Sequence, residues 1–262
     1  MKSRFYSASI ASAVLMILFF LSGCSKKEVT QFGQFGLHLS TQIDTNTVAV
    51  EGQLYPDHNG RLMAINDARF YISSVSLQKT DGSWYTIPGS LLLKTYEKQD
   101  YNITSVVPSG NYSAIKFYVG LDSLTNAINP AVDSNATNQD SVLSSTLEPN
   151  MYFGAGEGFK FFYFSGYILP SGSHSPVAVN YQIGGNANRQ LVTMSGLNFT
   201  VSQGRVHFVS IVCDYGKLFE GITISNSLNG NGNSFGNTAQ ANTATLVADS
   251  ISNMFSYVPF QP

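Results

Sequence analysis

The feature that most constrains the fold is that no segment between about residues 35 and 245 has the apolar period of a normal-length helix. This part of the chain consists of short β-prone runs separated by turns rich in Gly, Asn and Pro. Apolar residues that alternate over a few positions are typical of strands with one buried face. The sequence therefore predicts one all-β domain, an antiparallel β-sandwich with long Asn- and Gly-rich loops. The predicted strands are 35–39, 48–55, 68–77, 91–93, 114–121, 159–164, 177–183, 197–201 and 205–214.

The central stretch 151–166, MYFGAGEGFKFFYFSG, joins three closely spaced glycines to the most apolar of these runs. Glycines between aromatic residues let the backbone turn sharply or approach a neighbouring element closely. The run 159–164 is short and aromatic, which is typical of a buried strand. We expect its aromatic side chains, and also Phe153, to pack in the core.

Three further segments are polar or irregular. The long segment 122–150 is predicted to cross the surface, with room for one helical turn. The low-complexity segment 226–245 is predicted to be a loop, and 246–257 to be weakly helical or irregular.

The N-terminus has the pattern of a lipoprotein signal peptide. Lys2 and Arg4 precede the apolar run 10–21, which is too short to span a bilayer comfortably. Leu21-Ser22-Gly23-Cys24 matches the bacterial lipobox, which implies cleavage before Cys24 and lipidation of its sulfur. The alternative is an uncleaved anchor helix, but the abrupt change to polar residues after Cys24 disfavours it. The predicted organisation is a signal peptide (1–23), a lipidated tether (24–34) and the β-sandwich (35–262).

Ser25 follows Cys24 where an inner-membrane lipoprotein would carry an acidic residue, so we expect the outer membrane, facing the periplasm. Without Lys2 and Arg4 the chain keeps 12 of its 14 basic residues against 16 acidic ones, a formal charge of −4. No basic cluster is present, so nucleic acid is not an expected partner. Once Cys24 carries lipid, Cys213 has no partner within the chain, and a disulfide framework is excluded.

Six stretches, in this order, resemble the MbnP-like domain, a family of copper-binding proteins from methanobactin-type operons. Together they span about residues 35–258. The resemblance implies an envelope β-sandwich with a copper site and a di-haem peroxidase as partner. The stretches are RFYISSVSL, VPSGNYSAIKFYVGLDS, MYFGAGEGFKFFYFSG, YQIGG, CDYGKLFEG and SNMF.

The chain departs from the family pattern at the positions that carry the site. The family motif Met-Phe-Trp-x-Trp-x-x-Gly-Tyr corresponds here to the stretch that begins Met151-Tyr152. In this stretch Phe153 stands in place of the first tryptophan and Ala155 in place of the second. Gln182 stands where the family has the histidine of His-Ile-Gly-Gly, and no histidine follows Met254-Phe255. The resemblance therefore implies a retained scaffold with an altered site.

Copper in proteins prefers imidazole, thioether and thiolate ligands. His38 and His207 lie in predicted strands that could face one interior, and we take them as the candidate metal ligands. Scattered, hydrogen-bonded histidines are the alternative, because no two donors have the spacing of a metal motif. We expect His58 and His174 to face solvent and Cys213 to be a buried thiol. The full set of donors is His38, His58, His174, His207, Met63, Met151, Met194, Met254 and Cys213.

No catalytic motif is present, so we expect a protein without enzymatic activity. The segment 133–144 spaces oxygen-bearing side chains like a calcium loop but lacks the required Gly and final acidic residue, which favours a plain loop. Two functions stay open: copper binding, or binding of a glycan or protein on the same scaffold. The second would use aromatic side chains and the Asn-rich loop, since aromatics stack and amides pair donors with acceptors. The aromatic candidates are Tyr152, Phe153, Trp84 and Tyr85.

Overall fold

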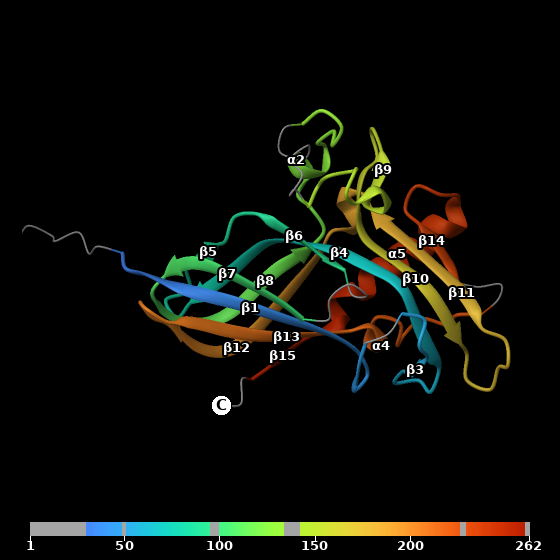
Figure 1. Cartoon of the computed structure of the whole chain (residues 1–262), viewed down its shortest axis with the longest axis horizontal. Coiled ribbons are helices and arrows are strands. Elements are labelled where there is room, and N and C mark those ends of the chain that lie inside the picture. Colours follow the sequence, from blue (N-terminus) through green and yellow to red (C-terminus); the bar gives the residue numbers. More distant parts are fainter. Residues whose placement is uncertain (1–29, 49–50, 95–99, 134–141, 226–228, 260–262) are drawn as a thin grey trace, which may run out of the picture. The chain divides into compact units, whose positions relative to one another are not determined.

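The computed structural model describes residues 30–48, 51–94, 100–133, 142–225 and 229–259. The compact unit formed by residues 32–262 contains two β-sheets, which confirms the predicted β-sandwich (Figure 1). The lipobox and Cys24 lie outside the described residues, as does most of the segment 133–144.

The smaller sheet is built on the parallel pairing of β1 with β13, two strands far apart in sequence. β1 starts at Phe32 rather than at residue 35, and β13 carries the predicted alternation, with Val209, Ile211 and Cys213 buried. The strand order is β15 (Phe255–Val258), β13 (Val206–Asp214), β1 (Phe32–Ile43) and β2 (Asn46–Thr47), with β7 (Asp100–Pro108) also paired to β1.

The larger sheet is centred on the long strand β4, which pairs with β8 on one side and β10 on the other. Its described pairs are antiparallel except that of β11 with β14, so the sandwich is mainly, not wholly, antiparallel. The order is β12 (Gln190–Val201), β8 (Gly110–Val119), β4 (Leu62–Lys79), β10 (Gly158–Leu169), β11 (Val177–Gly184) and β14 (Asn231–Asn233). β3 (Tyr55–Pro56), β5 (Trp84–Thr86) and β6 (Ser90–Lys94) also pair with β4, and β9 (Tyr152–Gly154) pairs with β10.

Aromatic rings join the two sheets. Phe255 of β15 makes edge contacts with Phe70 of β4 and Phe117 of β8, at centroid distances of 5.8 and 5.1 Å. Phe35 of β1 packs against Phe199 of β12 at 5.9 Å. Burying each such side chain stabilises the fold by about 1.5–3 kcal/mol, so these contacts hold the sheets face to face.

The predicted burial of 159–164 is confirmed, and its side chains serve two cores. Phe162 and Phe164 belong to the main core between the sheets. Phe159 and Phe161 pack in a second core with Tyr71, on the opposite face of the larger sheet. Because successive side chains of a strand point to opposite faces, the residues of β10 alternate between the two cores, and Tyr163 also packs against the second one.

Two sequence predictions are corrected. The expected strand 48–55 is absent from the described residues, where only the short β2 and β3 flank this region. The expected loop 226–245 contains the start of a helix, α5 (Thr238–Ser250), whose Asn237 and Gln240 form a reciprocal capping box. Its buried face is made of small residues, Ala244, Val247 and Ala248, so its apolar period is weak in the sequence.

The other described helices are short. The helical turn expected within 122–150 is confirmed as α2 (Ser123–Asn126), which Asp122 caps through the amides of Leu124 and Thr125. In the part of the chain that the structure describes, no helix has both the length and the apolar character needed to cross a membrane. The remaining ones are η1 (Pro149–Met151), η2 (Asn186–Asn188), α4 (Tyr215–Leu218) and η3 (Ile251–Met254).

Candidate functional site

The two candidate metal ligands lie on opposite faces of the smaller sheet. His38 projects from the outer face of β1, where its Nδ1 lies 3.3 Å from Ser210 Oγ. His207 pairs with Phe35 of β1 and stacks on Phe199 at 5.0 Å, on the inner face. Burial lowers the pKa of His207. The sheet therefore separates the two imidazoles, which cannot share one metal ion.

His58 and His174 are exposed, as predicted, but His58 is bound to its surroundings. Its Nδ1 lies 3.2 Å from Asp44 Oδ1 and its Nε2 lies 3.0 Å from Asp214 Oδ2. The hydrogen bond to Asp214 is the main cause that raises the pKa of His58. The two ring nitrogens point in different directions, so this arrangement ties turns together and does not chelate a metal ion.

The family-motif positions gather at one corner of the larger sheet. Phe153 of β9 makes an edge contact with Phe235 at 4.9 Å, and Lys160 Nζ lies 5.2 Å from the Phe153 ring. A Cβ on Gly184 would lie 2.7 Å from the same ring, so this glycine permits the close approach. Gln182 donates to Asn180 Oδ1 at 3.0 Å.

Two further motif positions, Tyr152 and Ala155, lie on either side of Phe153 in the sequence. Tyr152 packs against Phe159 at 5.1 Å, and Ala155 is exposed at the tip of the turn after β9. The prediction that Phe153 packs in the core is only partly right, because the ring is half-buried against Phe235.

The chemistry of these donors does not fit copper. The corner offers aromatic rings, an engaged amide and the Lys160 ammonium, where copper needs imidazole or sulfur ligands and would be repelled by a cation. Burial lowers the pKa of Lys160. Met63, Met151, Met254 and Cys213 are fully buried, and burial raises the pKa of the Cys213 thiol. Within the described ranges, no group of three or more His, Cys, Asp or Glu side chains could hold a metal ion.

The expected aromatic platform is not assembled. Trp84 lies on β5, well away from β9 in Figure 1, and Lys116 Nζ lies 4.0 Å from the centroid of its ring. Tyr85 packs against the main core. Phe153 is the candidate that does meet the Asn-rich segment, through Phe235.

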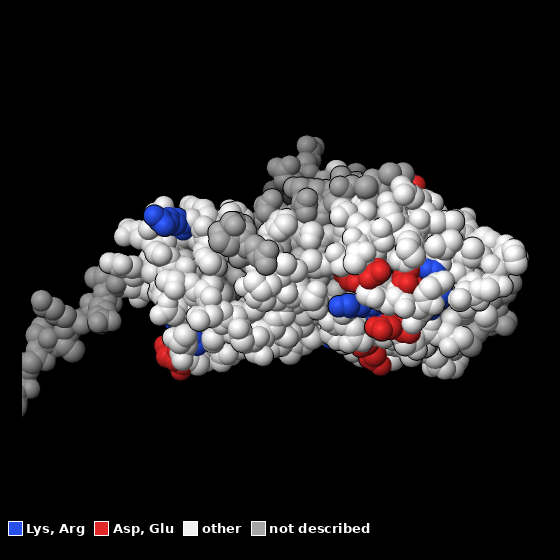
Figure 2. Space-filling view, turned by 90° about the horizontal axis from the view of Figure 1, so that it is seen from below, with Lys and Arg blue, Asp and Glu red and all other residues white. Residues whose placement is uncertain are grey.

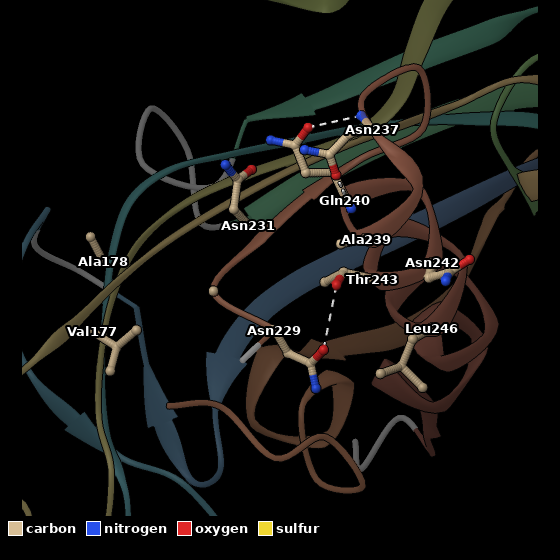
Figure 3. A pocket seen from close by; sticks show the side chains of 11 residues that line it. Val177, Ala178, Asn229, Asn231, Asn237, Ala239, Gln240, Asn242, Thr243 and Leu246 are labelled. Atoms are coloured by element: carbon tan, nitrogen blue, oxygen red, sulfur yellow. Dashed lines mark hydrogen bonds between the residues drawn. The ribbon is translucent and has the colours of Figure 1, made fainter. Parts of the chain in front are cut away.

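A groove that we call the amide groove lies between β11, β14 and α5 and has a volume of about 730 Å³ (Figure 3). Val177 and Ala178 lie on one side, the side chains of α5 on the other, and Asn229 and Asn231 between them. Sequence analysis missed it because its lining comes from three separate segments, and only the Asn-rich composition signalled it. Its polar lining consists of Asn229, Asn231, Asn237, Gln240, Asn242 and Thr243.

A smaller groove of about 340 Å³, the side groove, continues over the outer face of β10 and β11. It shares Ala178, Gly230 and Asn231 with the amide groove and adds Asn180 and Tyr167. None of the residues that line either groove is charged. On the face shown in Figure 2 the charged side chains form a few small groups, and the largest combines both signs.

A protein-family model described as MbnP matches residues 32–240, from the first strand to the first turn of α5. Among solved structures, MbnP from Methylosinus trichosporium matches with a TM-score of 0.54 and 14% sequence identity, over 87% of this chain and 98% of that one. At this identity the structural likeness concerns the fold alone. No curated protein matches the sequence.

Proposed function

This chain belongs to the MbnP family, and from that premise we propose that it is a lipid-anchored, non-enzymatic binding protein of the bacterial envelope whose ligand is not copper. The observation that carries the proposal is that the motif positions offer no copper donors, while an uncharged groove lies between β11, β14 and α5. In this proposal the family scaffold is kept and its ligand has changed. The di-haem peroxidase partner stays a prediction from the family resemblance.

The proposal is tested by titrating the full-length protein, purified in detergent, with Cu(I) and Cu(II). We expect no stoichiometric binding, because His38 and His207 lie on opposite faces of a sheet and the motif corner holds a lysine. The variants His38→Ala and His207→Ala should give the same titration curves as the unaltered protein. Stoichiometric copper binding that either substitution abolishes would overturn the proposal.

The lipid anchor is tested separately. In a bacterial host grown with radiolabelled palmitate, Cys24→Ser should abolish labelling of the protein, since the Cys24 sulfur is the predicted site of lipidation. Cys213→Ser is the matched control, because it removes the other thiol, which is buried in the core and far from the lipobox in sequence. An unaltered protein that takes up no label would instead favour an uncleaved anchor helix.

A further inference from the structure

We propose that the amide groove and the side groove together bind a neutral glycan chain. This inference rests on the proposed function and names the chemical class of the ligand. It differs from the aromatic platform expected from the sequence, because most of the polar side chains that line the two grooves are amides.

The lining of the two grooves matches uncharged, hydroxyl-rich molecules. It includes seven amide side chains and no Lys, Arg, His, Asp or Glu. A carboxamide presents an acceptor and a donor side by side, and a sugar hydroxyl both donates and accepts, so the two pair readily. An ionic ligand would lose its hydration here and gain no opposite charge in return. The seven amides are Asn66, Asn180, Asn229, Asn231, Asn237, Gln240 and Asn242.

These amides fall into two groups. Some hold the groove in shape: Asn237 and Gln240 form the capping box of α5, and Thr243 Oγ1 donates to Asn229 Oδ1 at 3.4 Å. Others are available: the side chains of Asn231 and Asn242 make no hydrogen bond with any residue that the structure describes, and Asn66 of the side groove makes none either. Their donors and acceptors are therefore left for water or for a ligand.

The groove also offers apolar surface of the kind that sugar rings contact. Tyr167, in the side groove, is 43% exposed, and Leu246, in the amide groove, is 41% exposed. A flat aromatic ring can stack against the C–H face of a sugar while the hydroxyls at its rim reach the amides. Tyr167 pairs with Ala178, a residue that both grooves share, so the aromatic ring lies next to the point where they join.

The shared residues suggest the length of the ligand. Because Ala178, Gly230 and Asn231 line both grooves, one extended molecule can cross from the amide groove to the side groove. Small-molecule sites usually measure about 300–1,000 Å³, and the amide groove alone lies within that range. We therefore infer an oligosaccharide or a segment of polysaccharide rather than a single sugar.

The groove is also pre-formed. α5 lies close to β14, where a Cβ on Gly232 would come within 3.0 Å of the Ala244 backbone nitrogen. Side chains on strands and a packed helix lose little freedom on binding, which favours affinity. A peptide ligand is less well matched, because strand-like peptides are recognised through pockets for alternate side chains, and here amide side chains lie between the apolar residues of the lining.

The test uses the full-length protein in a detergent without a sugar headgroup and measures binding by calorimetry. The neutral probes are cellohexaose, xylohexaose, maltohexaose and laminarihexaose. Heparin and oligogalacturonate serve as anionic probes, and tryptic peptides of casein as protein probes. We expect at least one neutral glycan to bind and the anionic and peptide probes not to bind.

Variants then locate the binding. Asn231→Ala should weaken glycan binding at least about fivefold, since it removes an amide that can make two hydrogen bonds, and Tyr167→Ala should weaken it by a similar factor. The matched control is Asn198→Ala, which alters an exposed asparagine of β12 at the opposite edge of the same sheet. Unfolding midpoints for the three variants verify that they remain folded.

The outcomes separate this inference from the proposed function. Neutral glycan binding that Asn231→Ala weakens and Asn198→Ala leaves unchanged supports the inference. Glycan binding that neither Asn231→Ala nor Asn198→Ala changes overturns the assignment of the binding site to the grooves. Binding of only anionic or peptide probes overturns the neutral-glycan class. Absence of binding by every probe also overturns it, while the copper titration alone decides whether the proposed function fails.

Discussion

Replacing Arg69 by methionine is expected to lower the free energy of unfolding by about 3–5 kcal/mol, because it removes the guanidinium that pairs with two carboxylates in a buried site. Arg69 Nη1 donates to Glu148 Oε2 at 2.7 Å, and Nε donates to Asp67 Oδ1 at 2.9 Å. Arg69 and Glu148 are 8% and 7% exposed. Methionine keeps much of the apolar stem, so the loss reports the charge. Urea unfolding at pH 7, followed by circular dichroism, measures it.

A matched control makes the Arg69 prediction specific. Arg205→Met makes the same chemical change at an exposed position and should shift the free energy of unfolding by less than about 0.5 kcal/mol. If both Arg→Met variants unfold at the same urea concentration, the ion pairs contribute nothing measurable.

The position of this cluster links stability to the family motif. Glu148 immediately precedes η1, and η1 leads through Met151 into β9, which carries Phe153. The ion pair thus fastens the start of the central stretch to β4. Loss of Arg69 should therefore loosen the segment that holds Phe153 against Phe235 as well as destabilise the sandwich.

The sequence was sufficient to predict the sandwich, because its signal is local and repeated. Alternation in 205–214 placed Val209, Ile211 and Cys213 on one face, which is the buried one, and the aromatic run 159–164 was correctly assigned to the core. Alternation could not predict which strands pair with each other in the sheets. The parallel pairing of β1 with β13 joins residues about 170 positions apart, and it alone decides that His38 and His207 face opposite sides.

The candidate site was harder to predict for a related reason. The Asn- and Gly-rich segment was assigned as a loop, since polar composition without an apolar period usually indicates one. The helix α5 forms there because Asn237 and Gln240 cap it and small residues suffice to pack it against Gly232 of β14. The amide groove exists only once this helix lies beside β11. Its two walls, at Val177 and in α5, are separated by more than 50 residues of sequence.

The second large effect is expected at Gly166, where alanine should lower the free energy of unfolding by about 3 kcal/mol, at the upper end of what overpacking costs. A Cβ on Gly166 would overlap the backbone carbonyl oxygen of Ala64 in β4, and it would lie 3.3 Å from the Ile65 Cα. Neither atom can withdraw without breaking the pairing of β10 with β4, the central pair of the larger sheet. Urea unfolding gives the measurement.

Gly221→Ala is the matched control for Gly166→Ala. A Cβ at Gly221 meets no atom within 4 Å, and its backbone does not adopt the left-handed conformation. There the substitution should leave the stability unchanged or raise it by up to about 1 kcal/mol, because alanine restricts the unfolded chain. The two variants thus remove the same backbone freedom and differ only in whether a neighbouring strand occupies the space of the new methyl group. Equal unfolding midpoints would mean that β10 and β4 can separate at little cost at the irregularity in their pairing between Ser165 and Gly166. The close approach of the two strands would then not be what holds the larger sheet together.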